Sequence, residues 1–185
     1  MKKLTLICFL ILSICLMGVA QAQNKQAKMK TKPIAAAMNA DSLPMPYPAL
    51  YSSNFVMGDP ANSRLILEMW KDFDDNAFER HEAMFADSTK IYMSDGQVVK
   101  GKDGMMEGVK MYRNSLADVK SDVHAYMSFK SVDRNENWVA IWGVENNTMK
   151  DGKKLSVSLH EIWKFNKDGK IDEIRQYSAK VPPAQ

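Results

Sequence analysis

Four segments in the second half of the chain alternate apolar and polar residues with a period of two, and they constrain the fold more than any other feature. They span residues 122–132, 137–149, 154–166 and 170–179. The last three are joined by short polar segments that contain Asp151-Gly152 and Asp168-Gly169. Asp-Gly between alternating runs indicates a tight hairpin, because such a turn needs a positive φ. We therefore predict an antiparallel meander.

The residues before the meander show the helical period instead. Asp59-Pro60 is typical of a helix start, with Asp as the N-cap. A stripe with helical spacing follows, formed by Ile66, Met69, Trp70 and Phe73. Next we expect a second short helix, a strand, a turn and a third helix, at residues 78–85, 90–93, 94–96 and 105–116. Helices and strands are segregated along the chain, so the predicted fold class is α+β with a mostly antiparallel sheet.

Residues 1–22 are typical of a secretory signal peptide. Lys2 and Lys3 precede an apolar run over residues 4–19, and Ala20-Gln21-Ala22 is a small-residue cleavage site. We expect cleavage after Ala22 and export to the periplasm or beyond the cell. An uncleaved anchor and a lipoprotein modified at Cys15 are the alternatives. The run is shorter than the ~20 apolar residues of a spanning helix, and Ile14 is large for a lipidation box, so both features favour cleavage.

Cleavage changes the composition that matters for function. It removes both cysteines, Cys8 and Cys15. It also removes Lys2 and Lys3, and so reduces the small excess of basic residues, 25 against 22 acidic ones in the full sequence. No basic patch interleaved with aromatic residues remains, so we expect no nucleic-acid partner. We expect no integral membrane segment after cleavage either. Residues 23–58 are rich in Lys, Gln, Ala, Met and Pro and predict a flexible tail, which leaves 59–181 as the folded domain.

One buried carboxylate is predicted on the strand at 154–166. Its odd-numbered face is apolar except for Glu161. A carboxylate on a buried face must be paired, hydrogen-bonded or protonated, because burial of a bare charge is costly. Desolvation would raise its pKa and suit it to acid–base chemistry near neutral pH. The alternative is a structural ion pair of Glu161 with Arg113 or Arg175.

A pocket lining can be proposed from the same patterns. On the strand 137–149 we expect the face with Trp138, Trp142, Val144 and Asn146 to pass from core into a wetter pocket. A concave apolar wall with a few polar groups is the usual make-up of a ligand site. The predicted ligand-binding residues are Met69, Trp70, Phe85, Met93, Tyr112, Trp142, Val144, Asn146, Trp163 and Gln176.

The order of elements and several short phrases resemble the nuclear transport factor 2-like superfamily, in particular its SnoaL-like and ketosteroid-isomerase-like branch. The phrases are Ala83-Met84-Phe85-Ala86-Asp87, Gly101 before the third helix, and the run from His160 to Ile171. The resemblance covers residues 59–181. It implies a cone, in which a curved, mostly antiparallel sheet wraps around three helices and encloses a pocket, and it implies a homodimer.

The isomerase branch implies an aspartate base on the first strand and a tyrosine with a protonated aspartate as oxyanion donors. The base position here falls on Met93, which takes no proton, and the tyrosine position falls near Met69 or Trp70. Glu161 is the counterpart of the late-strand acid. This departure argues against isomerisation of that kind, although Asp95 could act as a partner of Glu161 if it bends into the pocket mouth.

Three functions remain open at this point. The first is a ligand-binding protein for a small apolar molecule, and the second is a cyclase, isomerase or dehydratase with Glu161 and Asp95 as catalytic residues. The third is a non-catalytic dimeric module with a filled pocket. His81, His124 and His160 have no spacing typical of metal ligands, so we expect no metal site, and no motif predicts a cofactor.

Overall fold

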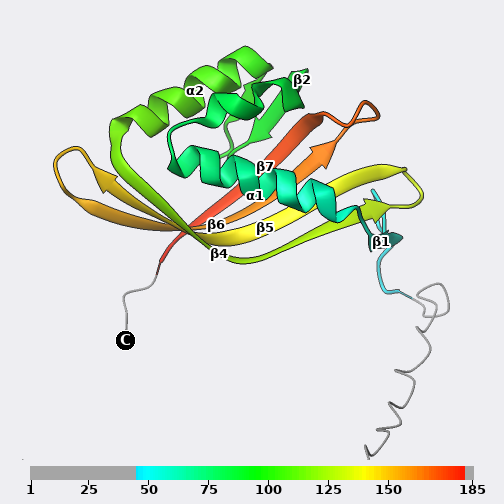
Figure 1. The fold of residues 1–185 in the computed structure, drawn as a ribbon. Coiled ribbons are helices and arrows are strands. Elements are labelled where there is room, and N and C mark those ends of the chain that lie inside the picture. The colour runs from blue at the N-terminus through cyan, green and yellow to red at the C-terminus, as the bar shows by residue number, and fades with distance from the viewer. Residues whose placement is uncertain (1–44, 182–185) are drawn as a thin grey trace, which may run out of the picture. The chain divides into compact units, whose positions relative to one another are not determined.

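The predicted meander lies at the centre of a seven-stranded sheet in a computed structural model of the chain (Figure 1). The structure describes residues 45–181, and the unit considered below begins at Tyr47. The strands are β1 (Phe55–Met57), β2 (Phe85–Tyr92), β3 (Val98–Lys100), β4 (Leu116–Ser131), β5 (Glu136–Met149), β6 (Lys154–Phe165) and β7 (Ile171–Lys180). They are arranged in the order β1-β4-β5-β6-β7-β2-β3. All neighbours are antiparallel except β2 and β7, which are parallel.

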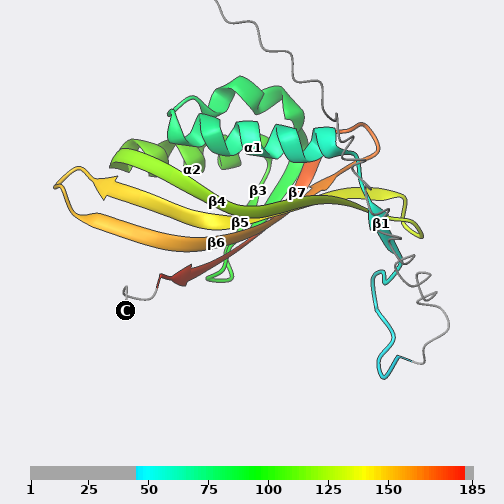
Figure 2. The same ribbon diagram turned by 60° about the horizontal axis from the view of Figure 1, so that its bottom comes forward.

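Three helices cover one face of the curved sheet (Figures 1 and 2). They are α1 (Pro60–Asp74), the 3-10 helix η2 (Phe78–Met84) and α2 (Lys102–Ser115). The core lies between this layer and the sheet, and its fully buried side chains include Ile66, Met69, Phe85, Met105 and Ile141. The fold is therefore α+β, with a curved and mostly antiparallel sheet wrapped around three helices, as predicted. None of the helices within residues 45–181 has the length and hydropathy to cross a membrane.

The start of α1 and the hairpin turns follow the sequence signals. The Asp59 side chain accepts a hydrogen bond of 2.8 Å from the Ala61 N–H, and Pro60 occupies the first turn. Gly152 and Gly169 adopt positive φ angles of 84° and 72° in the two Asp-Gly turns. Residues that have a Cβ atom rarely adopt such angles. These local choices set the register of β5, β6 and β7, and with it the face on which each side chain lies.

Two helix ends were placed too far along the chain by the sequence pattern. Phe85 was assigned to the second helix and Leu116 to the third, but both residues have extended backbone angles and begin β2 and β4. Both side chains are buried, so they satisfy an apolar helical stripe and an inward strand position equally well. The strand predicted at 122–132 is consequently longer, and the one predicted at 90–93 starts earlier.

Ordered structure also begins before Asp59. The segment Phe55–Met57, within the predicted tail, forms β1 and pairs with residues 129–131 of β4. Tyr51 packs edge-on against Trp138, with 6.0 Å between the ring centroids. The short strand β3 was not predicted, since three residues show no period. The predicted signal peptide and most of the predicted tail lie outside the described residues.

The sheet bends where β4 carries an irregularity opposite Gly143. The β4–β5 register shifts between Val123 and Ala125, which increases local twist in the bulged strand. Gly143 lies on the inward face of β5, and a Cβ there would collide with the Asp122 carbonyl oxygen. This close approach of two backbones is possible only with glycine.

We predict that Gly143→Ala lowers the free energy of unfolding by about 1–3 kcal/mol, because the two strands must separate to admit the methyl group. Urea denaturation followed by circular dichroism measures the change. Gly104→Ala is the control. A Cβ at this α2 position would only touch Val99 at 4.0 Å, so this variant should be as stable as the wild type or more stable. Equal stability of the Gly143 variant and the wild type would contradict the prediction.

Candidate active site

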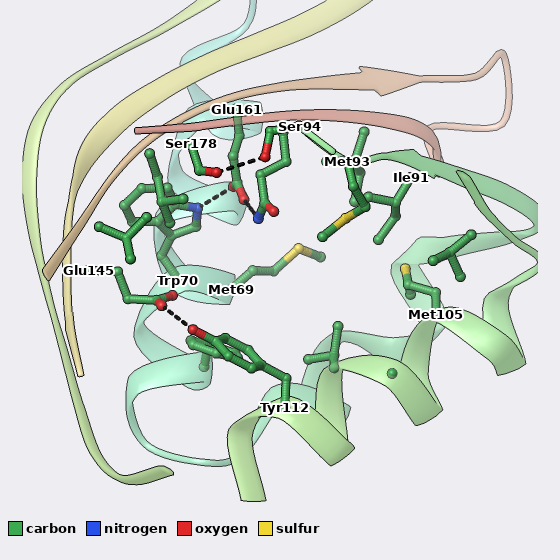
Figure 3. Close-up of a pocket in the computed structure, with 18 of the residues that line it drawn as sticks. Met69, Trp70, Ile91, Met93, Ser94, Met105, Tyr112, Glu145, Glu161 and Ser178 are labelled. Carbon is green, nitrogen blue, oxygen red and sulfur yellow. Dashed lines mark hydrogen bonds between the residues drawn. The ribbon is translucent and has the colours of Figure 1, made fainter. Parts of the chain in front are cut away.

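A cavity of about 510 Å³ lies between the helices and the inner face of the sheet (Figure 3). Most of its lining is apolar and includes Met69, Phe73, Met105, Val109, Val157 and Leu159. A smaller set of polar groups projects into it from β5, β6, β7 and the turn after β2. The predicted pocket of the cone is therefore present.

Glu161 is the best-buried carboxylate of this lining, with 6% of its surface exposed. Its Oε2 accepts hydrogen bonds from the indole N–H groups of Trp70, at 2.8 Å, and Trp163, at 3.0 Å. Its Oε1 accepts a third bond of 2.8 Å from the Gln176 amide. An indole N–H can only donate, so Oε2 must be an unprotonated oxygen, and any proton on the carboxyl group resides on Oε1.

Three elements bring these donors together, and the sequence explains each position. Trp70 belongs to the apolar stripe of α1, and Trp163 follows Glu161 by two residues on β6, so both project from the same strand face. Gln176 is the residue directly opposite Glu161 on β7. Side chains of directly opposed residues on antiparallel strands lie close together on one face.

Burial raises the pKa of the Glu161 carboxyl above its ordinary value. The hydrogen bonds from Gln176, Trp70 and Trp163 lower the pKa in turn, while the negative charge of Glu145 raises it. Desolvation is the largest of these effects, since no cation contacts Glu161 among the described residues to offset it. The carboxyl group can therefore exchange a proton closer to neutral pH than an exposed glutamate does.

The structural ion pair considered for Glu161 is wrong. The Arg113 guanidinium instead donates to the carbonyl oxygens of Phe73 and Asp74, at 2.9 Å each, and so caps the C-terminal end of α1. Arg175 pairs with Glu173 at 2.7 Å. Both arginines are occupied elsewhere, and Glu161 is held by neutral donors.

A second buried carboxylate, Glu145 on β5, lines the same cavity and was missed by the sequence reasoning. It is 8% exposed. Its Oε1 accepts hydrogen bonds from the Tyr112 hydroxyl, at 3.0 Å, and from the Asn147 amide, at 2.7 Å. Burial, followed by the charge of Glu145, raises the pKa of Tyr112 to about 12. Tyr112 therefore stays a neutral donor at any physiological pH.

Most of the predicted site residues meet in the cavity. Met69, Trp70 and Tyr112 from the helices, Met93 and Asp95 from the turn after β2, and Glu161, Trp163 and Gln176 from the sheet all line it. Phe85 does not. It is completely buried between Phe78 and Trp163, at ring-centroid distances of 5.7 and 6.3 Å, and is a core residue.

Trp142, Val144 and Asn146 also lie outside the cavity, because the even-numbered face of β5 points away from the helices. Trp142 is 37% exposed and packs against His160, and Asn146 bonds to Asp122 and Ser156. The cross-strand register shows why: Ile141 opposes Glu161, so the odd-numbered residues of β5 share the inner face. Because Trp138 and Trp142 lie on the even-numbered face of β5, the sequence pattern assigned the pocket lining to that face, which is the wrong one. The register with β6 would have placed Glu145 in the lining.

Asp95 lies at the mouth and makes no contact with Glu161. It is exposed, and its carboxylate accepts the Gln97 N–H at 2.9 Å, which stabilises the turn. The neighbouring Ser94 hydroxyl bonds to Ser178 at 2.7 Å and joins this turn to β7 (Figure 3). Within residues 45–181 no group of three or more His, Cys, Asp or Glu side chains could hold a metal ion.

The raised pKa of Glu161 has a consequence for stability. The native state holds this proton at pH values where the unfolded state has released it, so ionisation of Glu161 removes stability as pH rises above the ordinary glutamate pKa of about 4.3. We predict that Glu161→Gln, which mimics the neutral form, gains stability relative to the wild type as pH increases. The slope of the difference is at most about 1.4 kcal/mol per pH unit.

Urea denaturation of both proteins between pH 4 and pH 8 measures this difference, and the contributions of all other groups cancel in it. A flat difference would mean that the three hydrogen bonds balance desolvation, and a difference that turns against the variant with rising pH would mean that they outweigh it.

Comparison with known proteins agrees with this architecture. Solved structures similar to the chain include AclR, a candidate hydroxylase from Streptomyces galilaeus (18% identity, TM-score 0.54, 66% of this chain and 91% of that one). They also include IdmH, a candidate polyketide cyclase from Streptomyces antibioticus (15%, 0.51, 63% and 90%), and an LEH-like epoxide hydrolase from M. tuberculosis (10%, 0.52, 63% and 80%). At these identities the likeness shows the fold alone.

No curated protein matches the chain in sequence. A family model for the SnoaL-like domain matches residues 66–174, which is more than half of the chain and contains nearly all of the cavity lining. The chain belongs to the SnoaL-like domain family, within the nuclear transport factor 2-like superfamily.

Proposed function

We propose that the chain is an exported protein that binds a small apolar molecule in the cavity between the helices and the sheet. The observation that supports this most directly is the cavity itself, about 510 Å³ with mostly apolar walls. Ligand pockets are typically ~300–1,000 Å³, apolar, and furnished with a few placed polar groups. Here those groups are Glu161, Gln176 and Glu145 on the sheet and Tyr112 on α2.

Export is proposed from the signal-peptide pattern of residues 1–22, which precede the described part of the chain. The Lys2-Lys3 pair, the apolar run and the Ala20-Gln21-Ala22 site support it together. A ligand-binding protein released in this way would meet its ligand outside the cytoplasm.

The third function considered, a dimeric module with a filled pocket, is less well supported. It required a closed interior with Glu161 in an ion pair, whereas the cavity is open and Glu161 has neutral partners. The homodimer implied by the family resemblance stays a prediction. Its natural location is the outer sheet face, where Trp142, His160 and Tyr177 form a row across three strands and are each exposed.

Filling part of the cavity should weaken binding. We predict that Val157→Phe, on the inner face of β6, lowers the affinity for an apolar fluorescent probe at least about tenfold, because the added ring occupies ligand space. Val144→Phe is the matched control, since Val144 lies on the outer face of the adjacent strand. Fluorescence titration measures both affinities, and native mass spectrometry of protein purified from its own host shows whether a ligand accompanies it.

Equal loss of affinity in the two variants, or probe binding unaffected by Val157→Phe, would contradict binding in this cavity. Circular dichroism confirms that each variant is folded.

A second function, an enzyme of the cyclase, isomerase or dehydratase kind, is favoured by one specific observation. Glu161 is a buried carboxyl group with a raised pKa inside an apolar cavity, which is the usual arrangement for acid–base catalysis near neutral pH. Any proton it carries resides on Oε1, beside Gln176, so a reacting group would approach this oxygen. Asp95 is the partner proposed for it only if the turn closes over the mouth.

Under this second function, Glu161→Gln should reduce turnover of the ligand recovered from the protein by at least about a hundredfold, while the dissociation constant changes little. Single-turnover assays and calorimetry separate the two quantities. Asp95→Asn tests the proposed partner role of Asp95 in the same assays. Gln176→Glu is not used as a control, because it adds a charge beside Glu161. Unchanged turnover in Glu161→Gln would exclude the acid–base role.

A further inference from the structure

The hydrogen bonds around Glu145 are incomplete on the side of the cavity. Oε1 of Glu145 accepts two donors, the Tyr112 hydroxyl and the Asn147 amide, as Figure 3 shows for Tyr112. Oε2 accepts none from any residue between 45 and 181. Glu145 lines the cavity and is more than nine-tenths buried, so Oε2 is an acceptor that a molecule in the cavity can use.

A second acceptor beside it is also unmatched. Oδ1 of Asn147 is buried and has no hydrogen-bond partner in the described part of the chain, while its Nδ2 is shared between Glu145 and the Tyr112 hydroxyl. Acceptors therefore outnumber donors in this corner. A buried polar atom without a partner costs about 1–3 kcal/mol. Asn147 itself does not line the cavity, so a ligand would meet this corner at Glu145.

The charge of the cavity points in the same direction. Its titratable carboxyl groups are Glu145, Glu161 and, at the mouth, Asp95, whereas no Lys, Arg or His is found among the described lining residues. The charge of Glu145 raises the pKa of Glu161, so the two carboxyl groups interact across the cavity. A positive charge in this space would be attracted by both, and a negative charge would be repelled by both.

The aromatic lining suits a cation as well. Phe73 and Tyr112 are stacked, with 6.1 Å between their ring centroids, and both line the cavity, with Tyr112 bonded to Glu145. Aromatic faces attract ammonium groups that have lost part of their water. The apolar walls formed by Met69, Met105 and Val157 are left for hydrocarbon.

We infer that the ligand is an apolar molecule carrying a protonated amine, whose N–H groups donate to Oε2 of Glu145 while its hydrocarbon part fills the apolar cavity. This inference rests on the proposed binding function and specifies its ligand class. The ammonium loses its hydration on entry, and the charge-assisted hydrogen bond to a carboxylate offsets that loss. A carboxylate of the same size would carry a charge of the same sign as Glu145 and would offer no donor to its Oε2.

Three probes of one shape test this inference: 1-naphthylmethylamine, 1-naphthalenemethanol and 1-naphthoic acid, titrated calorimetrically into the purified protein at pH 7. We expect the amine to bind about tenfold more tightly than the alcohol and the acid to bind most weakly. Glu145→Gln should bring the affinity for the amine down to that for the alcohol. Glu107→Gln is the matched control, since it removes the same charge from an exposed position of α2 and should change nothing.

A variant with the carboxylate intact covers the case in which Glu145→Gln does not fold. Tyr112→Phe removes one donor from Oε1 and should preserve or increase the preference for the amine. Equal affinities for the three probes, or a preference for the acid, would overturn the inference and leave the binding function standing. A preference for the amine that persists in Glu145→Gln would overturn the role of Glu145. Binding of none of the probes by folded protein would instead count against the proposed function.

Discussion

The buried carboxylate of Glu161 and its three neutral donors hold the two layers of this fold in one arrangement. The donors come from α1, β6 and β7, so the helix and two strands converge on a single pair of oxygens. Removal of one donor would leave part of a buried carboxylate unsatisfied, which is more costly than loss of an exposed hydrogen bond. Trp70 joins α1 to the sheet through this carboxylate, which adds a specific polar contact to the apolar packing of α1 over the cavity.

The two carboxylates of the cavity differ in how they are satisfied, and the difference separates their roles. Glu161 receives donors on both oxygens, and its remaining capacity lies on Oε1 beside Gln176. Glu145 receives both of its donors on one oxygen and has the other available. The first group is therefore part of the wall that positions helix and sheet, while the second presents an acceptor to whatever enters. The negative charge of Glu145 also contributes to the raised pKa of Glu161.

The alternation of β6 identified Glu161 correctly, because a lone charge on an apolar strand face is visible in the sequence alone. The face of β5 could not be determined in this way. Its outer residues include Trp138 and Trp142, which look like core, while the inner face passes from the apolar Val139 and Ile141 to Gly143 and Glu145, which look like surface. The decisive information is the pairing of Ile141 with Glu161, a long-range relation that a local pattern does not contain. The prediction that Phe85 lines the pocket was wrong for a related reason, because the sequence pattern of a buried aromatic residue is the same in a core and in a pocket wall.

The same fold serves a candidate hydroxylase, a candidate cyclase and an epoxide hydrolase, so the lining rather than the architecture must decide what this chain does. Along β2 and the turn after it, the cavity meets Ile91, Met93, Ser94 and, at its mouth, the exposed Asp95. Ser94 bonds to Ser178 on β7. The two buried carboxyl groups of the lining, Glu145 and Glu161, lie on β5 and β6. The polar part of the lining is therefore concentrated on this side of the sheet, together with Tyr112 of α2, which donates a hydrogen bond to Glu145.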